Sequence, residues 1–121
     1  MLTVAQMRCL LALHALRQRN EKVPSKDIAR LLGISRPSAH RLLEALAACG
    51  LIDKPPYGAV ALSEEGARLA LQLENRRDHL ALIFARRFGL PMDEGACAAL
   101  LLMSGLREES LRALDAADTG A

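Results

Sequence analysis

The stretch SKDIARLLGISRPSAHRLLEALAACGLIDKPPYGAVAL, residues 25–62, decides the fold of this chain. Its opening part, residues 25–32, predicts a short helix with Ser25 placed to cap the first turn. Gly33 is placed to end this helix, because glycine readily adopts the left-handed backbone angles found at helix ends. We therefore expect a tight turn between two helices at this point.

The second helix of the stretch is predicted over residues 36–49. Ser35 is placed to cap it, and Pro37 falls in its first turn, where a missing backbone N–H costs little. One face is apolar and is expected to be buried; it consists of Ala39, Leu42, Leu43 and Leu46. The opposite face is polar and consists of Arg36, Ser38, His40, Arg41 and Glu44.

A β-hairpin is predicted after the second helix. Residues 51–54 and 59–62 favour short strands, and the Pro-Pro-Tyr-Gly sequence of residues 55–58 is typical of a turn. Two helices joined by a glycine turn and followed by a hairpin form a winged helix-turn-helix, which is a DNA-binding unit. There are two alternatives, a helical hairpin with a solvated basic face and a protein-contact module. Neither of them accounts for the predicted β-hairpin.

The dimensions of DNA indicate which side chains would contact it. The major groove admits one α-helix, whose N-terminal residues face the base edges. The donors at this end of the second helix are Ser35, Arg36, Ser38, His40 and Arg41. The small Ser35 and the rigid Pro37 let the backbone approach closely, and the helix dipole favours a nearby phosphate.

The remainder of the chain predicts helices only, so the expected fold class is mainly α. A first helix covers residues 4–19 and ends in a polar break over residues 20–24. A long helix opens at Ser63 as its cap and continues to Phe88. We expect it to join an N-terminal DNA-binding domain to an all-helical dimerisation domain, with the domains covering residues 1–62 and 63–121.

A nearly uninterrupted apolar segment, residues 96–103, lies within the C-terminal part. A helix that is apolar on all sides must be buried around its circumference. A chain of 121 residues has little with which to surround it, and a twofold partner would supply the missing cover. The segment therefore predicts a homodimer.

Composition excludes several classes of protein. Hydrophobic residues make up 51% of the chain and aromatic residues 2%, so the core must be built from leucine and alanine. No apolar run is long enough to cross a membrane, and residues 1–16 do not resemble a signal peptide. Three scattered cysteines, Cys9, Cys49 and Cys97, are expected to be buried thiols in a reducing cytoplasm. No catalytic grouping or phosphate loop is present, so we do not expect an enzyme.

The net charge of +2 is unevenly distributed. Residues 17–62 carry eight lysines and arginines against four aspartates and glutamates, whereas residues 63–121 carry seven against ten. A basic middle and an acidic end fit a DNA-facing part joined to a part that faces protein partners.

Several short segments occur in a recognisable order: residues 10–16, 25–50, 57–58, 62–66, 89–91, 96–97 and 103–104. Together they resemble the diphtheria-toxin-repressor family, the iron- and manganese-dependent bacterial transcriptional repressors, in the short form that lacks an SH3-like domain. The resemblance implies a homodimer that binds a palindromic operator in double-stranded DNA. It implies DNA contacts from Ser35, Arg36, Pro37, Ser38 and Arg41, with the wing tip near Lys54 and Tyr57 on the DNA backbone, and dimerisation through residues 63–114.

The same resemblance implies Fe(II) or Mn(II) as cofactor, but the ligands are mostly absent. At the matching positions of the first and the long helix the chain has Arg8, Leu11, Arg77 and Ala81, none of which supplies a suitable donor. In the apolar segment of residues 96–103, only Cys97 of the family's ligand pattern is kept. A residual site formed by Cys9, His79 and Cys97 is the alternative, and it would favour Zn(II).

These observations predict a cytoplasmic, dimeric, sequence-specific DNA-binding regulator that acts as a repressor and no longer responds to metal. One alternative is a winged-helix regulator that responds to a small ligand or to oxidation of one of its thiols. Another is an interaction adaptor that keeps the winged fold without binding DNA. The basic charge of residues 17–62 argues against the adaptor.

Overall fold

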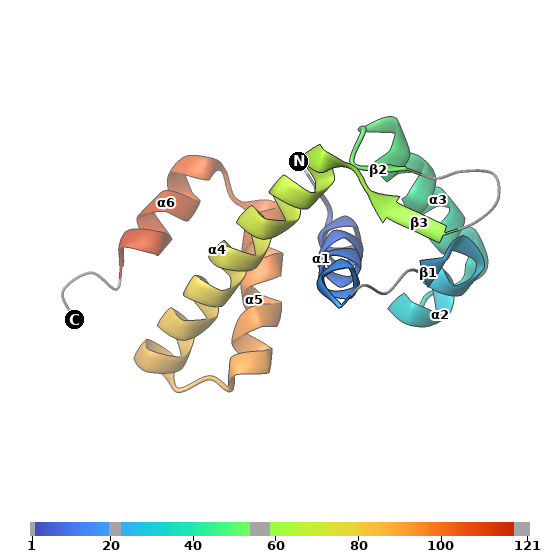
Figure 1. The fold of residues 1–121 in the computed structure, drawn as a ribbon. Coiled ribbons are helices and arrows are strands. Elements are labelled where there is room, and N and C mark those ends of the chain that lie inside the picture. The colour runs from blue at the N-terminus through green and yellow to red at the C-terminus, as the bar shows by residue number, and fades with distance from the viewer. Residues whose placement is uncertain (1, 20–22, 54–58, 118–121) are drawn as a thin grey trace. The chain divides into compact units, whose positions relative to one another are not determined.

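The structure, a computed structural model, describes residues 2–19, 23–53 and 59–117, and most of them are helical (Figure 1). The expected mainly α fold class is confirmed. The chain forms two compact units: residues 5–71, here called the N-terminal unit, and residues 1–4 with 72–121, here called the C-terminal unit. Within the described ranges, no helix is both long and apolar enough to cross a membrane.

The N-terminal unit is a winged helix-turn-helix. Its elements are α1 (Val4–Gln18), β1 (Val23–Pro24), the 3₁₀ turn η1 (Ser25–Asp27), α2 (Ile28–Leu32), α3 (Arg36–Ala48), β2 (Ile52–Asp53) and β3 (Ala59–Leu62). The strands form one antiparallel sheet with β3 in the middle (Figure 1). Val60 pairs with Val23 of β1, and Leu62 pairs with Ile52 of β2.

The start of this unit differs from the prediction in two ways. Residues 25–32 are not a single helix, because the turn η1 precedes α2. The residue that caps this turn is Pro24, with extended backbone angles, so the predicted capping by Ser25 is wrong. The predicted polar break over residues 20–24 is also wrong at its end, since Val23 and Pro24 form a strand paired with β3.

The turn between α2 and α3 forms as predicted. Gly33 has a φ of 67°, in the left-handed region that favours glycine, and its N–H donates to the carbonyl oxygen of Arg30. Ser35 caps α3, because its Oγ accepts the N–H of Ser38 at 3.2 Å. The predicted apolar face of α3 is buried in an aliphatic core; the buried residues of this unit include Leu10, Leu13, Ile28, Ala39, Leu42, Leu43, Leu46 and Val60.

Ser63 joins the end of β3 to the start of α4 (Glu64–Phe88). Its Oγ accepts the N–H of Gly66 at 3.0 Å, which confirms the predicted cap. The same hydroxyl donates to the carbonyl oxygen of Gly50 at 2.6 Å. One side chain therefore links the first turn of α4 to Gly50, which follows the C-cap of α3.

The C-terminal unit consists of most of α4 with α5 (Met92–Gly105) and α6 (Glu108–Ala116). Gly95 of α5 lies close to α4, since a Cβ there would be 3.1 Å from the carbonyl oxygen of Ala81. The buried residues of this unit include Leu80, Ile83, Ala99, Leu100, Met103 and Leu111. Burial around the whole circumference of residues 96–103 is not observed in the single chain, because Leu101 is 63% exposed.

Candidate nucleic-acid interface

The exposed face of α3 begins with three side chains joined by hydrogen bonds. The Oγ atoms of Ser35 and Ser38 are 2.9 Å apart, and Nη2 of Arg41 donates to Ser38 Oγ at 3.5 Å. The three residues are spaced three apart, so they lie along one side of the helix. Ser35 and Arg41 are exposed and Ser38 is half-buried, so the helix presents hydroxyl and guanidinium groups to solvent.

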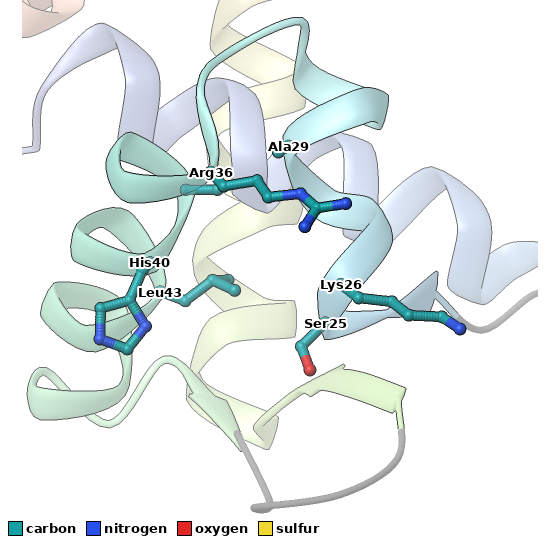
Figure 2. A pocket seen from close by; sticks show the side chains of 7 residues that line it. Ser25, Lys26, Ala29, Arg36, His40 and Leu43 are labelled. Atoms are coloured by element: carbon teal, nitrogen blue, oxygen red, sulfur yellow. The ribbon is translucent and has the colours of Figure 1, made fainter.

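Arg36 points in a different direction from this row. Its side chain extends from the first turn of α3 toward α2, beside a groove of about 270 Å³ (Figure 2). The groove is lined by Ser25, Lys26, Ala29, Arg36, Ala39, His40 and Leu43. Its lining is therefore partly aliphatic and also includes lysine, arginine and histidine.

His40 lines the groove and also lies near an acidic side chain of the same helix. Its Nε2 lies 3.9 Å from Oε1 of Glu44, one turn further along α3, and both side chains are more than half exposed. An exposed pair of this kind contributes little to stability, because water screens it. Its position on the outer face of α3 is the one expected from the sequence. Pro37 is exposed in the first turn, also as expected.

Two of the predicted contact residues, Lys54 and Tyr57, lie outside the described residues. In contrast, Ser25 and Lys26 line the groove although the sequence prediction did not include them. They belong to the turn before α2, and the local pattern of residues does not reveal that this turn lies beside α3. The available signal was the positive charge of Lys26 within the basic part of the chain.

The candidate metal ligands differ in their surroundings. Cys9 is buried in α1, and this burial raises its pKa to about 11, which disfavours the thiolate that a metal needs. His79 donates from Nε2 to the carbonyl oxygen of Asp115 at 2.8 Å. Among the described residues, no group of three or more His, Cys, Asp or Glu side chains could hold a metal ion. The prediction that every cysteine is buried is wrong, because Cys49, which follows the last residue of α3, and Cys97 on α5 are exposed.

The positions that match the family's metal ligands do not fit a metal. Arg8 is exposed on α1 and Leu11 is half-buried there. On α4, Nε of Arg77 donates to Oδ1 of Asp78 at 3.0 Å, and Ala81 is buried. A guanidinium cannot act as a ligand, and alkyl side chains have no donor atom. These four positions therefore cannot supply first-row metals with the oxygen and nitrogen ligands they prefer.

Charged side chains join α4 to α6 in the C-terminal unit. Arg76 forms two parallel hydrogen bonds with Glu108, Nη1 to Oε2 at 2.8 Å and Nη2 to Oε1 at 2.9 Å. Its Nε also donates to Oδ2 of Asp115 at 3.0 Å. The hydrogen bond to Glu108 raises the pKa of Arg76, and the same bond lowers the pKa of Glu108. A permanently charged guanidinium thus links two carboxylates of α6 to α4.

Comparisons with known proteins agree with this architecture. Residues 7–56 match the IclR helix-turn-helix domain. Over 50 residues the chain is 40% identical to the transcriptional regulator MntR of Escherichia coli O6:H1, a match that covers 41% of this chain and 32% of MntR. The solved structure of the manganese regulator SloR superposes with a TM-score of 0.77 at 22% identity, covering 91% of this chain and 51% of SloR. The chain therefore has the fold of the manganese regulator SloR.

A second solved structure, the hypothetical protein SSo2273 from Sulfolobus solfataricus, has a TM-score of 0.71 at 19% identity, covering 93% of this chain and 86% of that one. The diphtheria-toxin-repressor resemblance seen in the sequence is thus confirmed at the level of the fold. The chain spans about half the length of SloR and about a third of MntR. The helix-turn-helix match covers α2 and α3, the elements that form the groove and the exposed row.

Proposed function

We propose that this chain is a sequence-specific DNA-binding transcriptional regulator, acting as a dimeric repressor. The observation that carries the proposal is the exposed row formed by Ser35, Ser38 and Arg41 on the second helix of a winged helix-turn-helix. A helix placed in the major groove presents its N-terminal turns to the base edges. Arg41 has the forked donor geometry that matches the O6 and N7 acceptors of guanine.

The proposed DNA contacts divide by position. Ser35, Pro37 and Ser38 allow the first turn of α3 to approach the bases closely. Arg41 reaches furthest along the major groove of the DNA. Lys54 and Tyr57 at the wing tip contact the DNA backbone in this proposal. Residues 1–62 form the DNA-binding domain, and competition with polymerase for a promoter gives repression.

The proposed dimer uses the outward face of α5, within the dimerisation domain of residues 63–121. Cys97 and Leu101 lie one turn apart on this face and are exposed in the single chain. Neighbouring positions on the helix are small, Ala98 and Gly105, so a second helix could approach closely. A twofold copy would bury this face and present two α3 helices to the half-sites of a palindromic operator.

SloR, whose solved structure has the same fold, is described as a manganese regulator. For this chain we propose regulation of transcription without Mn(II) or Fe(II), because Arg8, Leu11, Arg77 and Ala81 replace the expected ligands. We propose a regulatory role for the chain and no enzymatic activity.

Selection of genomic fragments by the purified chain tests the proposal. We expect enrichment of a palindromic sequence and a mobility shift that weakens steeply with salt, as released counterions require. Leu101→Glu should yield monomers in sedimentation and lose operator affinity, whereas Arg107→Glu, a change at another exposed position of the C-terminal unit, should preserve both. Failure to enrich any sequence would favour the interaction adaptor.

A further inference from the structure

A polar hollow of about 540 Å³ lies between α4 and α6 in the C-terminal unit. It is lined by Gln72, Asn75, Arg76 and His79 of α4 and by Glu108 and Asp115 of α6. None of these residues is apolar, so a molecule that occupies the hollow must be bound through hydrogen bonds and charge. Sites of about 300–1,000 Å³ hold small molecules in other proteins.

The charged side chains of the hollow do not balance. Two carboxylates, those of Glu108 and Asp115, meet one guanidinium, that of Arg76. Glu108 is well compensated, because it forms two hydrogen bonds with Arg76 and also lies 3.5 Å from Nε of Arg112. Asp115 shares the same Arg76 through Oδ2 alone. The excess negative charge of the hollow therefore belongs to Asp115.

The surroundings of Asp115 leave this charge only partly compensated. Its Oδ1 is buried, and no hydrogen-bond partner for it occurs among the residues that the structure describes. His79 lies nearby, but its Nε2 donates to the backbone carbonyl oxygen of Asp115 and not to the carboxylate. The Asp115 side chain is 29% exposed, so a molecule in the hollow can reach the carboxylate. A positively charged donor at this point would complete its interactions.

We propose that the hollow binds a small organic molecule through a primary ammonium group, which pairs with Asp115. An ammonium has three N–H donors, and the exposed Gln72 and Asn75 offer amide oxygens for those that Asp115 does not use. A metal ion does not fit, because no group of three or more ligating side chains occurs among the described residues. The inference goes beyond the proposed function, since no DNA contact enters it.

Four small probes separate charge from hydrogen bonding. Ethanolamine carries the ammonium, ethylene glycol has a hydroxyl in its place, glycolate has the opposite charge, and tetramethylammonium has the charge without an N–H. Each is titrated into the full chain at constant ionic strength and followed by NMR. The side-chain amide resonances of Gln72 and Asn75 report on the hollow, and those of Gln6 and Gln18 on α1 are the matched reference.

Ethanolamine alone should shift the resonances of Gln72 and Asn75 saturably, with a dissociation constant in the millimolar range expected for so small a probe. Those of Gln6 and Gln18 should not move. A saturable shift with tetramethylammonium or ethylene glycol of the same size would overturn the proposal. If ethanolamine gives no saturable shift, water alone satisfies Asp115 and the proposal fails. The titration contains no DNA, so its result is independent of whether the chain selects an operator.

Variants assign the binding to named side chains. Asp115→Asn should abolish it, because the substitution removes the charge and keeps the shape. Asn75→Ala changes an exposed position and should weaken binding about two- to tenfold, as expected for one lost hydrogen bond. It keeps the proposal testable if Asp115→Asn unfolds the C-terminal unit. Glu109→Gln, at an exposed acid that does not line the hollow, should bind as wild type does. Unchanged binding by folded Asp115→Asn or by Asn75→Ala would overturn the assignment.

Discussion

Gly66, in the first turn of α4, lies directly against the carbonyl group of Leu51, the residue that precedes β2. A Cβ at residue 66 would overlap the carbonyl oxygen and would lie 2.9 Å from the carbonyl carbon. The same carbonyl oxygen accepts the N–H of Ser63 at 3.1 Å. The close approach therefore holds the end of α3, the wing and the start of α4 together within the N-terminal unit.

Replacing Gly66 with alanine should destabilise this unit by about 3 kcal/mol or more, because the obstacle is backbone that cannot turn aside. Gly33→Ala is the matched control: it meets no atom within 4 Å and incurs only the cost of a left-handed backbone, about 1–2 kcal/mol. Urea unfolding followed by circular dichroism measures both. A smaller loss for Gly66→Ala than for Gly33→Ala would refute the clash.

Local chemistry made much of this unit predictable from the sequence. Ser35 and Pro37 specify the start of α3 through interactions within one turn, and Gly33 specifies the end of α2. Apolar residues at helical spacing located the buried face of α3. These features depend on neighbours in the chain, so the sequence alone is sufficient to identify them.

Features that depend on distant partners were missed. The strand at Val23 forms because Val60 pairs with it from far along the chain. Lys26 lines the groove only because the turn at Gly33 brings η1 beside α3. Similarly, the composition of α5 did not reveal which side would remain exposed; that depends on which side faces α4, where Gly95 approaches Ala81.

The ion pair between Arg76 and Glu108 makes the C-terminal unit sensitive to acid. Because the hydrogen bond from Arg76 lowers the pKa of Glu108, the folded state binds this proton more weakly than the unfolded state. The stabilisation that this ion pair gives the folded state is complete above pH 4.5, the ordinary pKa of a glutamate. It is lost as the pH falls through the lower pKa that Glu108 has in the folded state. Wild type should thus have a higher Tm than Glu108→Gln at pH 7, and the difference should vanish in acid.

Glu109→Gln is the matched control for this prediction, since Glu109 is the neighbouring exposed acid in the first turn of α6. It should change Tm less than Glu108→Gln at neutral pH. The Glu108 effect should also shrink in 1 M salt, because Glu108 is half exposed and ions screen the pair. Equal effects of the two substitutions at every pH would mean that the ion pair contributes nothing.

The thiols should react at very different rates. Burial raises the pKa of Cys9 from 9.0 to about 11, so at pH 8 its thiolate is about 100-fold scarcer than that of an ordinary cysteine. We expect maleimide to modify Cys49 quickly and Cys9 only after unfolding, as read by mass spectrometry of peptides. Cys97 should become protected as protein concentration rises, if α5 forms the dimer. Rapid labelling of native Cys9 would contradict its burial.

Chelation tests the loss of metal control. The four positions that match the family's metal ligands hold Arg8, Leu11, Arg77 and Ala81, none of which binds a metal. EDTA should therefore change operator affinity by less than about twofold. Added Mn(II) or Fe(II) should have an equally small effect in a mobility shift. Cys97→Ser is the control for the residual Zn(II) site. If EDTA lowers operator affinity and Cys97→Ser has the same effect, the prediction is wrong and the residual Zn(II) site is supported.

Arg41 should determine base preference at one position of each half-site. Replacing it with alanine would remove the proposed bidentate contact to guanine, and such a contact is worth about 1–3 kcal/mol of discrimination. The measurement is a set of operators with every base substituted at each position, titrated against wild type and Arg41→Ala. The variant should lose preference at one position and retain it elsewhere. Equal loss across all operators would make Arg41 a phosphate contact.

Ser38→Ala provides the internal test of this geometry. Ser38 Oγ accepts from Nη2 of Arg41 at 3.5 Å, so its removal frees the guanidinium without removing its charge. We expect a smaller loss of discrimination at the same base pair, and no change in salt slope, because the number of phosphate contacts is unaltered. A Ser38→Ala effect at a different base pair would show that the two side chains act on DNA separately, despite their hydrogen bond in the free protein.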